Sequence, residues 1–167
     1  MIKLCKKDIS TVTESEFLRL LSRLPENLQK HIEKKKIFAD KVRSAVGYTL
    51  VLEEARDEIV FLENGKPCFK DVPLHFSISH SENMVIAAVS ERNVGADVEK
   101  IRDIPRGVAD RFFTEQEKQC DFFEIWTKKE AYGKYCGDMA KAFAKNVTEL
   151  SFYTEKDGEY VIAVYEE

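Results

Sequence analysis

Apolar residues recur at helical spacing through the first third of the chain and at shorter spacing further along. The segment Thr13–Glu16 has the sequence of a capping box, so a helix is predicted to begin there and to bury apolar residues as far as Leu24. Pro25 suits the first turn of a second helix. From Ala39 to Ala55 the apolar positions keep a roughly helical period despite Gly47, where we expect close packing or the approach of a ligand.

Strands are predicted in the middle of the chain and near its end, where short apolar runs are bounded by turn residues. The continuous run from Met84 to Val89 and the run from Val94 to Glu99 are interpreted as neighbouring strands of an antiparallel hairpin. Asn64-Gly65 and the segment from Glu155 to Gly158 are predicted turns. The predicted strands cover residues 59–62, 76–79, 84–89, 94–99, 147–153 and 160–165.

Further helices are predicted between these strands. One spans about Val108 to Phe113, a second capping box follows at Thr114–Glu117, and a longer helix runs from about Phe122 to Cys136, with Gly137 as its natural stop. The chain therefore combines helices with antiparallel strands, which predicts an α+β fold. No low-complexity linker divides the chain, so residues 1–167 are interpreted as one domain.

Length and composition narrow the class of protein. A chain of 167 residues suffices for one compact domain with a substantial core. Its 44% hydrophobic and 34% charged residues fit neither a disordered nor a membrane-inserted protein, and no apolar run approaches the roughly 20 residues of a membrane helix. The N-terminus lacks the apolar core of a signal peptide, so a cytoplasmic location without a membrane partner is expected.

Charge and cysteine content argue against three further classes of protein. The formal charge of −4, from 30 acidic and 26 basic residues, argues against a general nucleic-acid binder. The four cysteines are widely spaced and include no Cys-x-x-Cys pair, which argues against a zinc knuckle or a redox dithiol. Basic residues do cluster from His31 to Lys36, with Lys41 and Arg43 beyond. This run is either a solvated helix face or an electrostatic guide for an anionic ligand.

Two acidic segments indicate the chemistry. In a strand, Asp97 and Glu99 share one face, and in the helix that follows, Glu130 and Lys134 lie one turn apart, with Lys129 beside them. Three carboxylates and two lysines would then converge. This set suits a hard divalent cation such as Mg²⁺, which shares its oxygen ligands with substrate phosphates. The plainer interpretation is a solvated strand face and an ordinary helical ion pair between Glu130 and Lys134.

Five motifs follow one another in a recognisable order. The acidic segments are Gly95–Glu99, with the pattern Gly-x-Asp-x-Glu, and Trp126–Lys134, with the pattern Trp-x-x-Lys-Glu-Ala-x-x-Lys. Upstream of them stand Arg43–Gly47 (Arg-x-x-x-Gly), Asn64–Pro67 (Gly-Lys-Pro) and Phe76–Ser81 (Phe-x-x-Ser-His-Ser). In these segments the chain resembles the 4′-phosphopantetheinyl transferases, specifically the single-chain, surfactin-synthetase-activating (Sfp) type.

This resemblance implies a reaction and roles for the acidic and basic residues. The substrate would be coenzyme A, whose phosphopantetheine arm moves to a serine of an apo-carrier protein while adenosine 3′,5′-bisphosphate is released. The implied metal is Mg²⁺, with Mn²⁺ possible, held by Asp97, Glu99 and Glu130. Glu130 is the candidate to take the serine proton, Lys134 to stabilise the departing phosphate, and Lys129 to assist charge neutralisation.

The upstream motifs imply the contacts to coenzyme A. The matching residues are Arg43, Gly65, Lys66, Pro67, Ser79 and His80. In the family the Ser-His pair contacts the 3′-phosphate end of the substrate. Judged by its type alone, His80 also suits a structural histidine that is satisfied by backbone groups. Trp126 is expected to pack in the core rather than to touch a ligand.

The family's fold implies a single-chain pseudodimer, with similar halves of roughly residues 1–90 and 91–167 and antiparallel strands packed against helices. A site built from both halves predicts a monomer that is catalytically complete. Docking of the carrier is expected near Ile101 to Phe113, directly after the strand that carries the metal ligands. The Sfp type often has a proline-containing segment after the position of Lys134, whereas the last proline of this chain is Pro105. The C-terminal half is also short for this type.

Two other functions remain open from the residues. One is a Mg²⁺-dependent phosphohydrolase that uses the same carboxylates with water as the nucleophile. The other is a non-catalytic relative that binds coenzyme A or a carrier. A hydrolase would release its product without a protein acceptor, which separates it from a transferase. The sequence does not name a pathway, since fatty-acid, polyketide and nonribosomal-peptide carriers present a similar serine.

Overall fold

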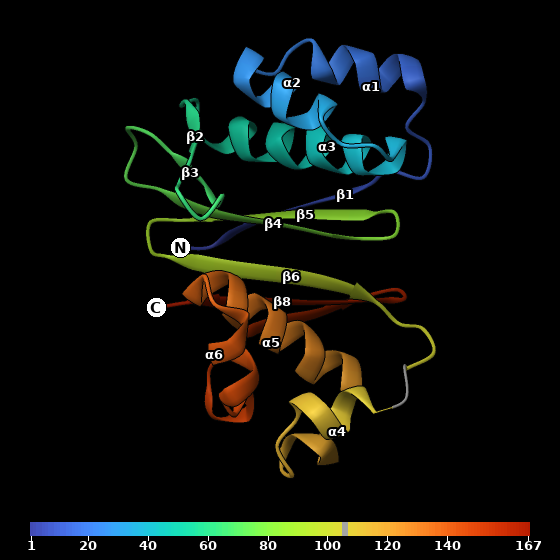
Figure 1. Ribbon diagram of the computed structural model, residues 1–167, viewed down its shortest axis with the longest axis vertical. Helices are drawn as coiled ribbons and strands as arrows, with labels where there is room; N and C mark the ends of the chain where they lie inside the picture. The colour runs from blue at the N-terminus through green and yellow to red at the C-terminus, as the bar shows by residue number, and fades with distance from the viewer. Residues whose placement is uncertain (105–106) are drawn as a thin grey trace.

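The computed structural model describes residues 1–104 and 107–167, which form four layers: helices, two antiparallel sheets and helices again (Figure 1). The first sheet has the strand order β1-β5-β4 and the second the order β6-β8-β7. Their strands are β1 (Lys3–Asp8), β4 (His75–Ser81), β5 (Met84–Ser90), β6 (Val94–Lys100), β7 (Tyr153–Asp157) and β8 (Tyr160–Glu166). A small hairpin of β2 (Ile59–Phe61) and β3 (Pro67–Phe69) stands beside the first sheet.

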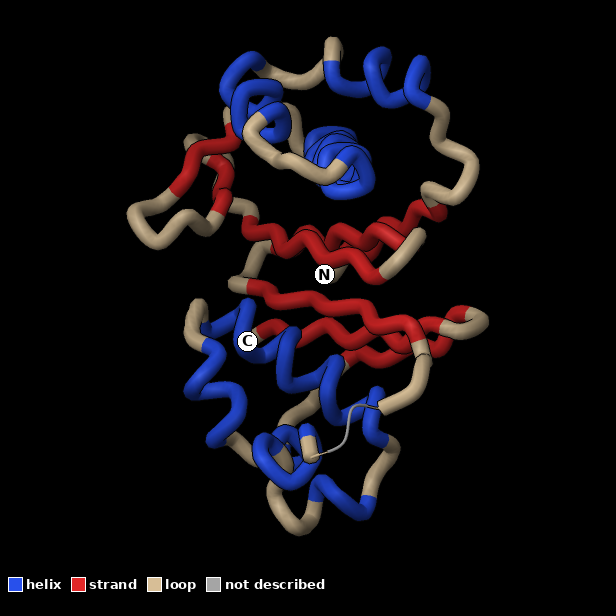
Figure 2. Tube along the Cα trace, turned by 45° about the vertical axis from the view of Figure 1, so that its right-hand side comes forward, coloured by secondary structure: helices blue, strands red, loops and turns tan. Residues whose placement is uncertain are grey.

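Helices cover the outer face of each sheet, and the two inner faces lie toward each other (Figures 1 and 2). On the first sheet these are α1 (Glu14–Leu21), α2 (Glu26–Glu33) and α3 (Phe38–Glu54). On the side of the second sheet they are α4 (Val108–Phe112), α5 (Phe122–Cys136) and α6 (Met139–Ala144), with 3₁₀ turns η1 (Glu117–Gln119) and η2 (Val147–Glu149). The mixed helix and antiparallel-sheet architecture confirms the predicted α+β class.

Local capping signals fix the ends of the predicted helices. Thr13 and Glu16 form a reciprocal capping box, in which the Thr13 amide donates to Glu16 Oε2 (2.9 Å) and the Glu16 amide to Thr13 Oγ1 (3.3 Å). The Asp121 side chain caps α5, which ends at Gly137 with φ of 67°. These boundaries agree with those that the sequence predicts.

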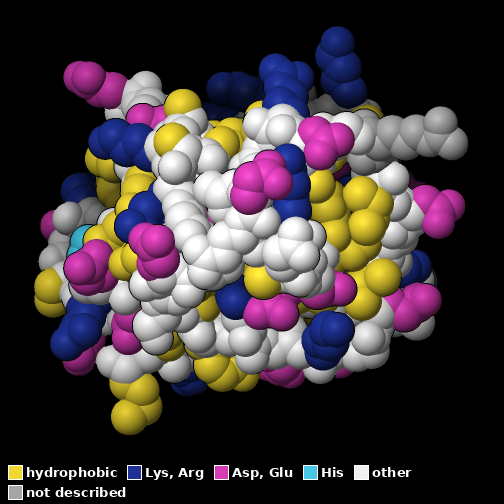
Figure 3. Space-filling view, turned by 90° about the horizontal axis from the view of Figure 1, so that it is seen from below, with side chains coloured by type: hydrophobic (Ala, Val, Ile, Leu, Met, Phe, Trp, Pro, Cys, Tyr) yellow, Lys and Arg dark blue, Asp and Glu magenta, His cyan; other side chains and the backbone are white. Residues whose placement is uncertain are grey.

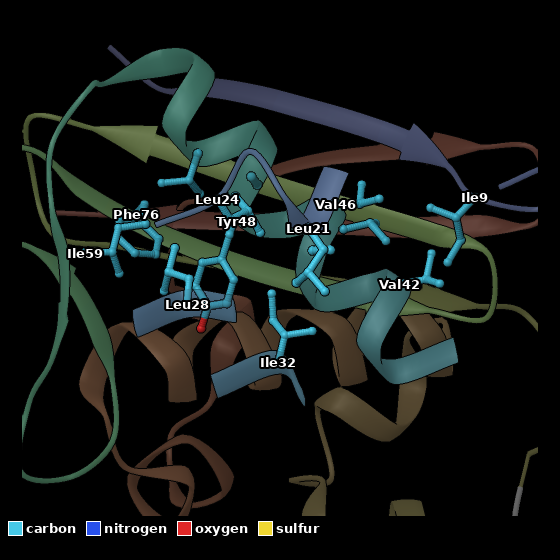
Figure 4. Close-up of a cluster of buried hydrophobic side chains, with 14 of the residues drawn as sticks. Ile9, Leu21, Leu24, Leu28, Ile32, Val42, Val46, Tyr48, Ile59 and Phe76 are labelled. Carbon is cyan, nitrogen blue, oxygen red and sulfur yellow. The ribbon is translucent and has the colours of Figure 1, made fainter. Parts of the chain in front are cut away.

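The first core lies between α1, α2 and α3 and the outer face of the first sheet (Figure 4). Leu28, Ile32 and Val46 are among the buried side chains that meet there. A Cβ atom added to Gly47 would lie 2.6 Å from Cγ2 of Ile78, so the glycine lets α3 lie directly on β4. Of the two roles expected for Gly47, the structure shows the packing role.

A second core joins the two sheets. It is composed of buried apolar residues from the facing strands: Met84, Ile86, Ala88, Val94, Ala96, Val98, Ile162 and Val164. At one edge, the ammonium group of Lys6 on β1 lies 2.6 Å from Glu155 Oε1 and 2.7 Å from Asp157 Oδ2 on β7. The sheets are thus held by a shared apolar interface and by ion pairs that contribute little individually, because they are partly exposed.

The predicted hairpin of residues 84–89 and 94–99 is wrong. β5 pairs with β4 on one edge and with β1 on the other, whereas β6 pairs with β8 in the second sheet. Every residue of β5 is buried, as suits a central strand. Both hydrogen-bonding edges of β5 are occupied, so the chain passes to the other sheet after Ser90.

Three further differences arise from local structure. The predicted strand at 147–153 is instead the turn η2 followed by β7, because the Asn146 side chain accepts a hydrogen bond from the Thr148 amide and caps the turn. The capping box of Thr114 and Glu117 forms, but one 3₁₀ turn follows it rather than an α-helix. The sequence did not predict β1, β3 or α6.

The surface carries both signs of charge. Viewed from the end of the molecule that holds α4 to α6, lysines and arginines alternate with acidic residues and apolar side chains (Figure 3). None of the helices in the described part of the chain is both long and apolar enough to cross a membrane.

We predict that replacing Glu82 by asparagine stabilises the protein. Glu82 begins the two-residue turn between β4 and β5 with φ of 49°, a left-handed conformation that asparagine tolerates better than glutamate. The free energy of unfolding measured by urea denaturation should rise by about 0.5–1 kcal/mol. Glu91→Asn, in the exposed loop after β5, is the control and should change stability little. A destabilised Glu82→Asn variant would contradict the prediction.

Candidate functional site

The site begins with the close approach of α5 to β6. A Cβ atom added to Gly95 would collide with the carbonyl oxygen of Ala131 and the amide nitrogen of Tyr135, so only glycine allows this contact. The glycine of the Gly-x-Asp-x-Glu pattern therefore lets the backbone of the helix lie on the strand. As a result, the side chains of Glu130 and Lys134 reach those of β6.

Three carboxyl groups meet at this contact. Asp97, Glu99 and Glu130 each offer an oxygen atom, and these atoms lie within 4.8 Å of one another. Asp97 and Glu99 share a face of β6, as the alternation of a strand requires, and Glu130 approaches them from α5. Asp97 is buried and the other two are half-buried. The predicted convergence of the three is therefore confirmed, and the alternative of a solvated strand face is wrong.

Lys134 joins this cluster through Asp97. Its ammonium nitrogen lies 2.7 Å from Asp97 Oδ1 and 2.7 Å from Ser79 Oγ, and the Ser79 hydroxyl also donates to Asp97 Oδ1 (2.6 Å). Lys134 thus pairs with Asp97 rather than with Glu130. The other oxygen of Asp97, Oδ2, is buried and has no hydrogen-bond partner among the described residues.

The electrostatics of the cluster favour a cation. Burial and, next, the charge of Asp97 raise the pKa of Glu130 to about 7. The same two causes raise the pKa of Glu99. A divalent cation between the three groups would remove this repulsion and use the free Oδ2 of Asp97. An all-oxygen donor set fits Mg²⁺ or Mn²⁺ rather than a metal that prefers sulfur.

Three side chains bind the carboxylate of Glu99, and sequence analysis did not identify them as its partners. Trp126 Nε1 donates to Glu99 Oε1 (3.3 Å), the Ser81 hydroxyl donates to Oε2 (3.2 Å), and the guanidinium of Arg102 lies 3.6 Å from Oε2. The Trp126 ring packs against Phe112, Phe122 and Phe143, as expected of a core residue. Ser81 is the last residue of the Phe-x-x-Ser-His-Ser motif and lies two residues after Ser79, on the same face of the strand, but no role was assigned to it.

A cavity of about 480 Å³ adjoins the cluster. Five of the six residues assigned to coenzyme A line it, namely Arg43, Gly65, Lys66, Pro67 and His80. Lys134 lines it too, so this lysine borders both the cavity and the carboxyl cluster. Of the basic run from His31 to Lys36, His31 and Lys35 line the cavity, whereas sequence analysis missed Tyr48 as a lining residue.

The cavity is positively charged and its basic groups are held in place. The Arg43 guanidinium donates to Asp40 Oδ1 (2.9 Å) and to the Glu82 carbonyl (2.9 Å), and Lys66 Nζ donates to the carbonyl of Lys134 (3.3 Å). Desolvation, followed by the charges of Arg43 and Lys134, lowers the pKa of His80, and burial lowers that of Lys66. A bound anion would offset these costs of crowding positive groups together.

Two site assignments are corrected by the structure. Lys129 is fully buried on another side of α5, where its ammonium lies 3.0 Å from Glu117 Oε1 and 2.8 Å from the Lys145 carbonyl. Adjacent helical residues point about 100° apart, so Lys129 cannot join Glu130 in the cluster. Ser79 does not line the cavity, because strand alternation turns its hydroxyl toward Asp97 while His80 faces the cavity.

Comparison with known proteins gives a consistent result. Residues 93–167 match the family model described as the 4′-phosphopantetheinyl transferase superfamily. The chain is 35% identical to the 4′-phosphopantetheinyl transferase gsp of Aneurinibacillus migulanus over an alignment of 153 residues. This alignment covers 76% of this chain and 64% of the relative.

Two relatives from Bacillus subtilis are similar at comparable levels. The 4′-phosphopantetheinyl transferase ffp is 34% identical over an alignment of 129 residues, with 70% of this chain and 56% of the relative covered. The 4′-phosphopantetheinyl transferase Sfp of strain 168 is 32% identical over an alignment of 133 residues, with 72% of this chain and 58% of the relative covered. The chain therefore spans less than two thirds of the length of these relatives.

The carboxyl cluster predicts a pH dependence of stability for Glu130→Gln. In the folded protein the pKa of Glu130 is about 7, against 4.5 for the ordinary group, so the folded state binds more protons between these values. Stability of the parent should therefore fall as the pH rises from about 4.5 to above 7. Glutamine carries no charge, so at pH 8 in EDTA the variant should be more stable by about 1–3 kcal/mol, and at pH 4 the two should agree.

Denaturant unfolding at several pH values measures this difference, with the exposed Glu63→Gln as the control. A Glu130→Gln variant that is less stable than the parent at pH 8 would show that the three carboxylates do not repel one another.

Proposed function

Because the chain belongs to the 4′-phosphopantetheinyl transferase superfamily, we propose that it transfers the phosphopantetheine arm of coenzyme A to a serine of an apo-carrier protein. Adenosine 3′,5′-bisphosphate is the second product. The observation that carries the proposal is the position of Lys134, which borders the basic cavity and pairs with the carboxyl cluster. A substrate with a nucleotide at one end and a pyrophosphate in its middle suits this adjacency.

The carboxyl cluster is the proposed metal site. Asp97, Glu99 and Glu130 would hold Mg²⁺, and Mn²⁺ would fit the same oxygen ligands. When bound, the cation neutralises charge on the phosphate oxygens of the substrate. The support is the free, buried Oδ2 of Asp97 together with the raised pKa of Glu130.

The basic cavity is the proposed site for the nucleotide half of coenzyme A. Its volume of about 480 Å³ is in the range usual for small-molecule sites. Arg43, Lys66 and His80 offer donors to the phosphate groups, and Gly65 and Pro67 form the adjoining wall. Ser79 has no place in this set, since its hydroxyl is committed to Asp97 and Lys134.

Proton transfer and departure of the leaving group fall to two residues of α5. The serine oxygen of the carrier forms a bond to the phosphorus nearest pantetheine, and the pyrophosphate P–O bond breaks as the bisphosphate leaves. Glu130 offers one carboxylate oxygen to the cluster, and its other oxygen is the proposed acceptor of the serine proton. Lys134 has three N–H donors, of which two go to Asp97 and Ser79, so the third is available to the departing phosphate.

We interpret the fold as a single-chain pseudodimer with halves of about residues 1–90 and 91–167. In support, each half contributes one three-stranded antiparallel sheet with a long helix against it, α3 on the first sheet and α5 on the second. The cavity derives largely from the first half and the carboxylates from the second. One chain therefore provides the whole proposed site, and a monomer should be active.

The carrier is expected to dock beside the metal site. Ile101 and Ile104 follow β6 directly and are 41% and 50% exposed, which leaves an apolar surface next to Glu99. They belong to the predicted docking segment 101–113, of which residues 105 and 106 lie outside the described part of the chain.

The direct test is incubation with coenzyme A, Mg²⁺ and a panel of apo-carriers, followed by measurement of the intact mass of each carrier. Attachment of phosphopantetheine is expected for at least one carrier. Asp97→Asn should reduce the rate on the order of 100-fold or more, because a metal contributes several kcal/mol to such a transition state. Asp71→Asn, an exposed matched substitution, should retain activity. Near-normal transfer by folded Asp97→Asn, or product release without a carrier, would refute the proposal.

A second prediction concerns the cavity. Lys66→Met should raise the KM for coenzyme A about tenfold or more while changing kcat less, because a contact to the nucleotide is made equally in the ground and transition states. Lys70→Met, on the same hairpin but exposed and paired with Glu58, is the control. Steady-state kinetics at saturating carrier measure both constants. A loss confined to kcat would place Lys66 at the reacting phosphate instead.

A further inference from the structure

Three serines of β4 lie on one face of the strand and bind β6. Ser77, Ser79 and Ser81 alternate with residues that face α3 and the cavity, and all three are buried. β4 and β6 belong to different sheets and lie side by side (Figure 1). Because no ladder of backbone hydrogen bonds joins the two strands, these hydroxyls make the polar contacts between them.

The three hydroxyls differ in what they bind. Ser77 Oγ accepts from the backbone amide of Ala96 (3.0 Å) and touches no metal-site carboxylate. Ser79 donates to Asp97 Oδ1 (2.6 Å) and accepts from Lys134 (2.7 Å). Ser81 donates to Glu99 Oε2 (3.2 Å) and accepts from the backbone amide of Lys100 (3.0 Å).

We propose that Ser79 and Ser81 are positioning residues for the divalent cation, each holding one ligating carboxylate in the orientation that the cation needs. Ser77 joins the two strands and also lines the cavity, but it holds no ligating carboxylate. This inference rests on the proposed function in one respect, namely that the carboxyl cluster binds Mg²⁺ or Mn²⁺. It gives Ser79 a role at the metal, in place of the contact to coenzyme A that its motif implied.

The physical reason is the repulsion between the carboxylates. Groups of like charge within 4.8 Å tend to rotate apart unless other bonds fix them. Ser79 and Lys134 together occupy Oδ1 of Asp97, which leaves Oδ2 free for a cation. Ser81 restrains Glu99 from the same strand. Partners of this kind typically change metal affinity 10–100-fold when they are removed.

The test measures direct binding of Mn²⁺ to the full chain without coenzyme A. Binding is monitored as the loss of the free Mn²⁺ signal in electron paramagnetic resonance. Mg²⁺ competition in the same samples gives its affinity. Ser79→Ala and Ser81→Ala should each bind Mn²⁺ about 10–100-fold more weakly than the parent. Ser77→Ala, a matched control in the same strand, should bind within about twofold of the parent. Thermal unfolding of all three variants reports whether each is folded.

The outcomes separate the two claims. Unchanged Mn²⁺ affinity in folded Ser79→Ala and Ser81→Ala would overturn the positioning role, as would an equal loss in Ser77→Ala or a parent that binds no Mn²⁺. If Ser79→Ala does not fold, the Mn²⁺ affinity of Ser81→Ala alone decides whether the positioning role holds. A parent that shows the expected binding pattern but modifies no carrier would refute the proposed transfer and leave the positioning role intact.

Discussion

The structure depends on holding three mutually repelling carboxyl groups together in a place that is largely shielded from water. Their oxygens lie within 4.8 Å, and burial together with the charge of Asp97 raises the pKa of Glu130 to about 7. Gly95 allows the three groups to approach, because it lets α5 lie on β6. The ammonium of Lys134 then offsets the negative charge of Asp97. The remaining negative charge makes the cluster suited to binding a cation.

Strand β4 connects this cluster with the basic cavity. One face carries the serines that bind β6, and the other carries His80 toward the cavity. A ligand in the cavity and a cation at the carboxylates would therefore be positioned by the two faces of a single strand. Lys134 borders both places. The fold thus brings motifs that are far apart in the sequence to one place.

The sequence predicted what is decided locally. The bounds of α5 followed from Asp121 and Gly137, and the convergence of the carboxylates followed from strand and helix periodicity. Strand partners were not predictable in this way, since the run 84–89 gives no sign of which edges it will occupy. Lys129 illustrates the same limit. Its buried partner Glu117 lies 12 positions away in the chain (129 − 117), and only the folded structure brings them together.

The most direct test is a pH titration of the Glu130 carboxyl carbon by ¹³C nuclear magnetic resonance, assigned with the Glu130→Gln variant. In EDTA, the midpoint should lie at about 7. Saturating Mg²⁺ should lower this midpoint, because a bound cation favours the ionised carboxylate. A midpoint in the ordinary range of glutamate in EDTA, unchanged by Mg²⁺, would show that the three carboxylates neither repel one another nor share a cation.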